Sequence, residues 1–356
     1  MWKESYMNSF TVTLRCKFSR RLFIVVASLC LAPAWAGSLD IHLSPTGSDA
    51  AEGRTPNDPI ATLGRAQEIV AAKAAGHDEV RVLFAPGVYQ GQNVVWKTFP
   101  GIWIRFMPAV PKAKVVFDGR TAKESVFFRG APPDPTQKTK ALPMKLEFRS
   151  IVISHYCEGI SLRSWSDDVR VPGGQENIIR ENIFENIGSK YDPVVRKGKR
   201  RGGCTAALRL MGVENNLVEN NVFNHIINID KKDTTLSRYG PAHLHAIYIA
   251  NMSSGNRIIN NKFDDFSGDP VRIRDKSDRN KVEDNIFGSA SANTKPGDIY
   301  AISQWYCNDS IEACLTRYAN RKECPSEAIE YKGNVIKGRG VAEYANRAVG
   351  KPTCSY

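Results

Sequence analysis

Short stretches of alternating hydrophobic and polar residues recur along the second half of the chain, a pattern typical of β-strands with one buried face. Five of these stretches begin at Ile160, Leu208, Ile247, Val271 and Ile302. A second unit, an asparagine followed two residues later by an apolar residue, comes after each stretch, at Asn182, Asn221, Asn261, Asn285 and Asn334. Both units advance by the same 24 residues between their third and fourth copies, so two independent markers predict one repeat.

The earlier asparagines are 39 and 40 residues apart, which fits the same repeat interrupted by polar insertions near 189–203 and 229–243. A repeat of this length with several short strands is typical of a stacked solenoid. Its inward side chains are Ile, Leu, Val and Phe, as a narrow dry core requires, and its asparagines are expected at bends, bonded to the coils above and below. A leucine-rich repeat has a similar length but needs a denser leucine pattern than this chain has.

The first 36 residues have the pattern of a secretory signal and are left out of the fold. Four basic residues between 15 and 21 precede an apolar run at 22–31, and Ala34-Trp35-Ala36 supplies small residues where a signal peptidase reads them. We therefore expect cleavage between Ala36 and Gly37 and a secreted or periplasmic protein. The apolar run is too short to span a bilayer, and no other segment approaches that length.

The cysteines support export, because an even number in an exported chain favours disulfides. Two of the eight leave with the signal, and six remain: Cys157, Cys204, Cys307, Cys314, Cys324 and Cys354. Four of the six lie in the last 50 residues, which predicts a disulfide-stapled C-terminal segment at 307–356. Cys157 and Cys204 lie shortly before strands of coils that are predicted to be neighbours, and we expect them to form a bridge.

The N-terminal part of the chain contains motifs of a known superfamily: IHLSPTGSD at 41–49, PIATL at 59–63, PGVY at 86–89 and VVFDG at 115–119. These motifs resemble the secreted right-handed parallel β-helix proteins of the pectate-lyase-like superfamily, and the resemblance covers most of 39–340. It implies an all-β, single-stranded right-handed parallel β-helix over 37–356, with an N-terminal capping α-helix at 62–75. Lyases, epimerases, hydrolases and non-catalytic proteins share this fold, so the resemblance selects no activity.

In that superfamily, substrates lie along one face of a sheet. When the strands are aligned on their first apolar residues, the next position of each points outward, giving Ser161, Arg209, Tyr248, Arg272 and Ser303. Arg163 and Arg274 follow two residues later, and His245 and Asp269 lie two residues before the aligned position. The preceding segment adds Tyr239 and His243. It resembles the Tyr-Gly…His segment of alginate epimerases and lyases, but Ala242 stands where an acidic residue is expected.

These residue types suit abstraction of the C5 proton of a uronate. An arginine pairs with the sugar carboxylate without losing its charge, a role for Arg272 or Arg209. A neutral histidine, His245 or His243, is the candidate base, and Tyr248 or Tyr239 is the candidate acid. Loss of the 4-O substituent gives a lyase, and return of the proton from the opposite face gives an epimerase.

The net charge favours an anionic partner. The whole chain carries +12, and the chain after residue 36 carries +8. A basic run at 196–201 and the insertion near 229–243 are expected at the rim of this face. They supply four candidate substrate contacts: Lys197, Lys199, Arg200 and Lys231. We expect an acidic polysaccharide as the partner and no nucleic acid, because no aromatic-basic interleaving of the single-strand-binding kind occurs. We also expect a monomer, with calcium at Asp269 or Asp275 as the one cofactor considered.

Two other functions stay open. A non-catalytic carbohydrate-binding or cell-surface protein fits the same fold, and in it His245 satisfies a turn, Tyr248 is an exposed strand aromatic, and Arg272 forms a structural ion pair. A glycoside hydrolase is less supported, because the adjacent carboxylates Asp264 and Asp265 align away from the proposed face.

Overall fold

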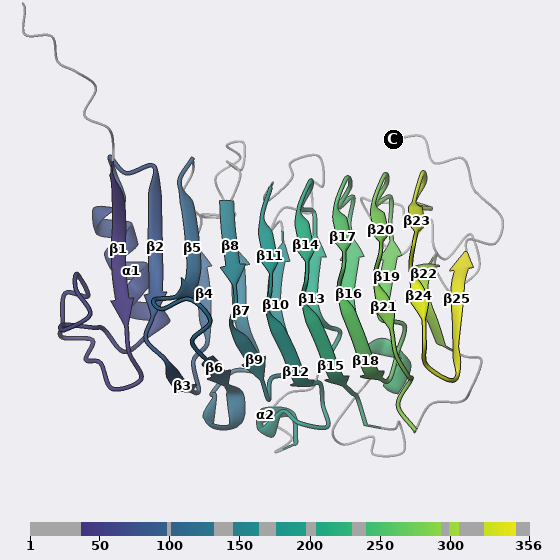
Figure 1. Cartoon of the computed structure of the whole chain (residues 1–356), viewed down its shortest axis with the longest axis horizontal. Coiled ribbons are helices and arrows are strands. Elements are labelled where there is room, and N and C mark those ends of the chain that lie inside the picture. Colours follow the sequence, from purple (N-terminus) through teal and green to yellow (C-terminus); the bar gives the residue numbers. More distant parts are fainter. Residues whose placement is uncertain are drawn as a thin grey trace, which may run out of the picture. The chain divides into compact units, whose positions relative to one another are not determined.

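The computed structural model describes residues 37–97, 101–131, 145–163, 176–196, 204–229, 240–292, 299–305 and 324–346. These residues form a right-handed parallel β-helix, in which the chain winds repeatedly through three parallel sheets (Figure 1). The fold class predicted from the repeat and the resemblance is therefore confirmed. Residues 1–36 lie outside the described residues, so the secretory signal stays a prediction.

Each of the three sheets, named A, B and C, takes one strand from each coil. Sheet A contains β1 (Ser38–Leu43), β2 (Glu79–Phe84), β5 (Trp103–Pro108), β8 (Lys145–Arg149), β11 (Ile178–Arg180), β14 (Leu217–Glu219), β17 (Arg257–Ile259), β20 (Lys281–Glu283) and β23 (Glu330–Lys332). Sheet B contains β3 (Gly87–Gln90), β6 (Val115–Asp118), β9 (Val152–Ser154), β12 (Ile183–Ile187), β15 (Val222–Ile226), β18 (Lys262–Phe266), β21 (Ile286–Phe287) and β24 (Val335–Ile336). Sheet C contains β4 (Val94–Lys97), β7 (Val126–Ala131), β10 (Glu158–Arg163), β13 (Ala206–Met211), β16 (His245–Ala250), β19 (Val271–Arg274), β22 (Ile299–Trp305) and β25 (Val341–Asn346).

Helix α1 (Leu63–Lys73) lies within the predicted range 62–75 and supplies the N-terminal cap. Thr62 begins it, because its side chain accepts a hydrogen bond from the backbone N–H of Arg65, a donor that lacks a partner inside the helix. Its buried residues share one face at helical spacing: Leu63, Ala66, Ile69 and Val70. They join the core at the N-terminal end of the solenoid. Shorter helical turns are η1 (Gly119–Thr121), α2 (Pro193–Arg196) and η2 (Pro241–His243).

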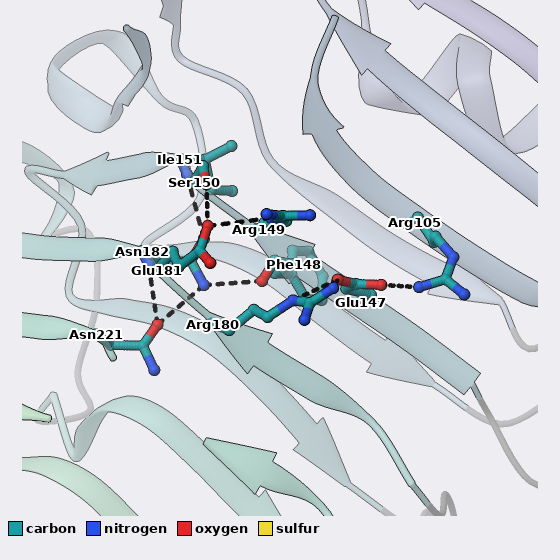
Figure 2. Close-up of polar contacts among 10 residues, drawn as sticks. All are labelled: Arg105, Glu147, Phe148, Arg149, Ser150, Ile151, Arg180, Glu181, Asn182 and Asn221. Atoms are coloured by element: carbon teal, nitrogen blue, oxygen red, sulfur yellow. Dashed lines mark hydrogen bonds and ion pairs between the residues drawn. The ribbon is translucent and has the colours of Figure 1, made fainter. Parts of the chain in front are cut away.

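The predicted asparagine ladder runs along the bends between sheets A and B. The Oδ1 atom of Asn221 accepts hydrogen bonds from the backbone N–H of Asn182, at 3.0 Å, and from its Nδ2, at 3.1 Å (Figure 2). Asn221 donates in the same way to Asn261, and the series continues to Asn285 and Asn334. The side-chain amides also donate to backbone carbonyls of the coil before, as Asn221 does to Ile179, so the ladder satisfies buried polar groups at the bends.

A second ladder, which the sequence reasoning missed, lies five residues before the first one. It consists of Asn177, Asn216, Asn256 and Asn280, all buried and linked in the same pattern. The signal was present, because an asparagine stands at this offset in four successive repeats. A sheet A strand separates the two ladders, and the residue that follows it, at the bend into sheet B, is left-handed, as in Asn220 at φ 55° and Asn260 at φ 56°. Asparagine tolerates this conformation better than most residues.

The core of the solenoid contains apolar side chains that are stacked in register from coil to coil. Phe184, Phe223, Phe263 and Phe287 occupy one position in successive coils of sheet B, and their ring centroids are 4.8–5.1 Å apart. This spacing matches the distance between neighbouring strands, so an aromatic column fits the coil repeat without distortion.

Charged residues on the outside of sheet A are also paired between coils. Figure 2 shows the carboxylate of Glu147 between the guanidinium groups of Arg105 and Arg180. Glu147 is 2% exposed, and its two oxygens each contact one arginine. A carboxylate this deeply buried needs such partners, because removal from water disfavours its charge.

The bridge predicted between Cys157 and Cys204 is present, joining the residues before β10 to those before β13. Its two cysteines are 47 residues apart, and both are fully buried. Cys324 is buried and disulfide-bonded as well. Cys307, Cys314 and Cys354 lie outside the described residues, so the stapled C-terminal segment stays a prediction.

Replacing both bridge cysteines, as Cys157→Ala with Cys204→Ala, is expected to lower the free energy of unfolding by about 4 kcal/mol. The reason is that the unfolded chain then regains the freedom of a 47-residue loop. Urea unfolding measures the change without touching the other disulfides. An unfolding free energy equal to that of the parent protein would contradict this prediction.

Asn221→Ala is expected to lower the free energy of unfolding by about 3 kcal/mol or more, because it removes buried hydrogen bonds to three neighbours, Asn182, Ile179 and Asn261. Asn334→Ala is the matched control at the partly exposed end of the same ladder, and a loss of about 1 kcal/mol is expected there. Urea unfolding compares the two variants. Equal losses would show that position in the ladder has no effect on its energy.

Candidate functional site

The proposed face is the outer side of sheet C, and its strands pair in the register that the sequence alignment assumed. Ile160 pairs with Leu208, Leu208 with Ile247, Ile247 with Val271, and Val271 with Ile302. One residue later on each strand, the same pairing gives an outward row that begins one coil earlier: Arg129, Ser161, Arg209, Tyr248, Arg272 and Ser303. Adjacent members are one strand spacing apart, about 4.8 Å.

An interruption of the alternation in β16 puts His245 on the same side as Tyr248. Strict alternation would turn a residue three positions before Tyr248 inward. In this strand, however, two consecutive residues, Ala246 and Ile247, both belong to the core. The same doubling occurs at Ala207 and Leu208. The residue before each doubled pair therefore faces outward, and the rings of His245 and Tyr248 stack with centroids 5.6 Å apart.

Arg272 is held by three side chains on the face. Its Nη2 lies 2.5 Å from Oδ2 of Asp269, its Nε donates to Oγ of Ser303 at 3.2 Å, and its guanidinium lies over the ring of Trp305. The arginine side chain is 12% exposed. Burial lowers the pKa of Arg272 from its ordinary value, and Asp269 opposes that shift. Arginine stays charged under such shifts, so the site keeps a fixed cation in a defined orientation.

Asp269 connects Arg272 with His245. Its second carboxylate oxygen accepts the backbone N–H of Tyr300 at 2.9 Å, and its backbone oxygen lies 2.8 Å from Nδ1 of His245. A carbonyl oxygen only accepts, so Nδ1 of His245 carries the hydrogen and Nε2 keeps its lone pair. His245 is 2% exposed, and burial, together with the charge of Arg272, lowers its pKa well below 6.5. The imidazole is therefore neutral at pH 7.

A second group of charges occupies the earlier coils of the face. The Nη2 atom of Arg209 donates to Oε1 of Glu158 at 2.8 Å, and Glu158 is 2% exposed. Burial lowers the pKa of Arg163, and the charges of Arg129 and Arg209 lower it further. Five arginines thus share the outer side of sheet C, and we call this surface the arginine face: Arg129, Arg163, Arg209, Arg272 and Arg274.

The remaining predicted residues are distributed as follows. His243 ends η2 and is exposed at the edge of the face, while Asp275 is buried at a left-handed position after β19. Five predicted contacts lie outside the described residues: Tyr239, Lys197, Lys199, Arg200 and Lys231. Arg129 and the stacking role of Trp305 were missed. Arg129 lies in a coil without the asparagine marker, so nothing in the repeat identified its strand.

A bound metal or a membrane span finds no support in the described part of the chain. There, no three His, Cys, Asp or Glu residues are grouped to hold a metal ion. Asp269, one of the two calcium candidates, has both carboxylate oxygens committed to Arg272 and Tyr300. The described helices are all too short or too polar to cross a membrane.

A solved structure is similar to this chain, whereas sequence comparisons found no match. No protein-family model matches the chain, and no curated protein matches it. The crystal structure of pectate lyase Pel9A is similar at a TM-score of 0.40 and 14% identity, over 78% of this chain. The chain spans 57% of the length of that protein.

The buried histidine makes folding stability depend on pH. The folded state of His245 resists protonation, whereas the unfolded state takes a proton near pH 6.5. The stability contributed by the neutral histidine is therefore complete above that pH and is lost as the pH falls below it. We expect His245→Gln to reduce the slope of unfolding free energy against pH below 6.5, by at most about 1.4 kcal/mol per pH unit.

Urea unfolding of both proteins between pH 8 and pH 5 measures this effect, with the pH values chosen to span that loss. Taking the difference between the two proteins removes the contributions of the other titratable groups. Identical slopes would mean that His245 is protonated equally easily in the folded and unfolded states.

Proposed function

We propose that the protein acts on an acidic, uronate-containing polysaccharide at the arginine face, by abstraction of the C5 proton, as a lyase or a C5-epimerase. One observation carries this proposal. Arg209, Tyr248 and Arg272 stand in register on three consecutive strands, with His245 and His243 beside them. This arrangement brings cations, a phenol and imidazoles within the length of one or two sugar units.

The arginines suit neutralisation of the uronate carboxylate. Arg209 and Arg272 are two strand spacings apart, about 10 Å, and Tyr248 lies between them. A sugar whose carboxylate binds either arginine therefore has its ring near Tyr248. Pairing with a guanidinium makes the C5 proton more acidic, because the negative charge that develops on the carboxylate is stabilised.

The histidines and tyrosines suit the proton transfers. A base takes the C5 proton, and in a lyase the electron pair forms the C4–C5 double bond as the C4–O bond breaks. An acid then protonates the leaving oxygen. His243 is the exposed histidine, whereas His245 lies under the ring of Tyr248. We assign substrate contact to His243 and Tyr248, and to His245 the support of the Tyr248 ring.

Export and the basic rim belong to the same proposal. A secreted or periplasmic protein meets acidic polysaccharides outside the cytoplasm, and a positive rim at Lys197, Lys199, Arg200 and Lys231 would raise their local concentration. The disulfide between Cys157 and Cys204 supports an oxidising compartment.

A second function, binding of the same polysaccharide without catalysis, is favoured by a specific observation. Arg272 and Arg209 already form ion pairs with Asp269 and Glu158, so both are held as fixed cations. Fixed cations serve binding as well as catalysis. The hydrolase alternative gains no support, because Asp264 and Asp265 lie on β18 of sheet B, and Asp265 pairs with His225.

The test is incubation of the protein with alginate, pectate and glycosaminoglycans in deuterated buffer, with and without calcium. Absorbance of the unsaturated uronate reports a lyase, and deuterium at C5 without absorbance reports an epimerase. Tyr248→Phe removes one oxygen from the face and is expected to lower kcat by about 100-fold or more. Arg272→Ala is expected to abolish turnover.

The matched control is Arg257→Ala, which removes the same charge from an exposed position on sheet A. It should keep full activity, whereas circular dichroism checks that Arg272→Ala remains folded. If no polymer shows absorbance or C5 deuterium, the catalytic proposal fails. If, in addition, no polymer binds the parent protein more tightly than the Arg272→Ala variant, the binding alternative fails too.

A further inference from the structure

A cavity of about 420 Å³ opens on the outer side of sheet B, among its first four strands. It is separate from the arginine face, which belongs to sheet C. Its size is that of a site for a small ligand. Neither the repeat nor the resemblance pointed to it.

Strand alternation arranges three kinds of side chain across this cavity. Lys114, Val116 and Asp118 occupy alternate positions in and just before β6, so they share the outer side of the sheet. Val88 pairs with Val116 on the neighbouring strand, which widens the apolar part. On the other side, Asp118 is in register with Ser154, and Ser154 with Glu185, forming a polar row.

Two of the charged residues at the cavity, Asp118 and Arg120, form an ion pair, and two others, Lys114 and Glu185, are open to a ligand. Oδ2 of Asp118 accepts a hydrogen bond from Nε of Arg120 at 2.8 Å, and His155 lies beside the same carboxylate. Burial raises the pKa of Asp118, but Arg120 and His155 outweigh it, so the pKa lies below its ordinary value. Lys114 and Glu185 also line the cavity, and neither forms an ion pair within the described part of the chain.

The two open groups limit the ligand. Lys114 lies four residues, about 13 Å, from Asp118 along the strand, so the cation and the polar row stand at opposite ends of the cavity. A ligand that fits has a carboxylate at one end, a C–H surface in the middle and hydroxyl groups at the other end. A polyanion or inorganic phosphate fits poorly, because the open carboxylate of Glu185 repels it.

We propose that this cavity binds a small acidic saccharide of one or two units. Its carboxylate pairs with Lys114, one face of its ring packs on Val88 and Val116, and its hydroxyls donate to Glu185 and Ser154. The inference does not rest on the proposed function, because its residues belong to another sheet.

Saturation-transfer NMR with glucuronate and galacturonate tests the proposal on the full chain, with glucose, galactose and acetate as comparison probes. We expect the uronates to bind, the neutral sugars to bind about 10-fold more weakly, and acetate to give no competition. Lys114→Ala should weaken uronate binding about 10-fold, since it removes one charge-assisted contact. Glu185→Gln should weaken the binding of both the uronates and the neutral sugars.

Filling the cavity provides the sharpest test. Val88→Trp should abolish uronate binding at this cavity, because the indole occupies its apolar part. Val335→Trp is the matched control, since Val335 stands in the same row of sheet B on its last strand and is 46% exposed, against 45% for Val88. Both positions are open enough to accept the larger side chain without loss of fold.

The outcomes separate this site from the arginine face. In the Arg272→Ala protein, the uronate signal that Val88→Trp removes should persist, whatever happens to the proposed catalysis. The proposal is overturned if the uronates do not bind, if acetate competes as well as a uronate does, or if Val88→Trp binds as tightly as Val335→Trp.

Discussion

The structure depends on the fixed distance between neighbouring parallel strands, about 4.8 Å. Every position of a coil is repeated at that distance in the next coil, so a residue type placed there forms a column. The asparagine ladders, the phenylalanine column and the Arg105–Glu147–Arg180 cluster are three results of this rule. In each of them a group that one coil cannot satisfy finds its partner in the next coil.

The same rule decided what the sequence could predict. An asparagine recurs at the same bend in successive coils and is easily recognised in the sequence. It therefore marked the repeat, and the register of sheet C was predicted correctly from Ile160 to Ile302. The bridge between Cys157 and Cys204 followed from that register. The capping helix was implied by the resemblance, and the spacing of its four apolar residues is helical, which needs no partner to be recognised.

The parts that were missed lie where this marker is absent or where the strand departs from alternation. The coils containing Asp118 and Arg129 have no bend asparagine in the series, so Arg129 and the cavity near Asp118 could not be aligned. His245 was placed at this face, but the reason that it points outward, the two consecutive inward residues Ala246 and Ile247, is one that a period of two cannot represent. Hydrogen-bond partners such as Ser303 for Arg272 depend on side-chain conformations, which a strand pattern leaves undetermined.

The disulfide between Cys157 and Cys204 also works as a check on coil registration during folding. Solenoid coils resemble one another, so a chain that slips by one coil still buries many of its apolar side chains. No cysteine occurs between Cys30 and Cys157 or between Cys204 and Cys307. A slip in either direction would therefore leave a thiol without a partner at this level of the stack. Oxidation would then trap only the correctly registered chain and leave slipped chains in the thiol form, free to refold.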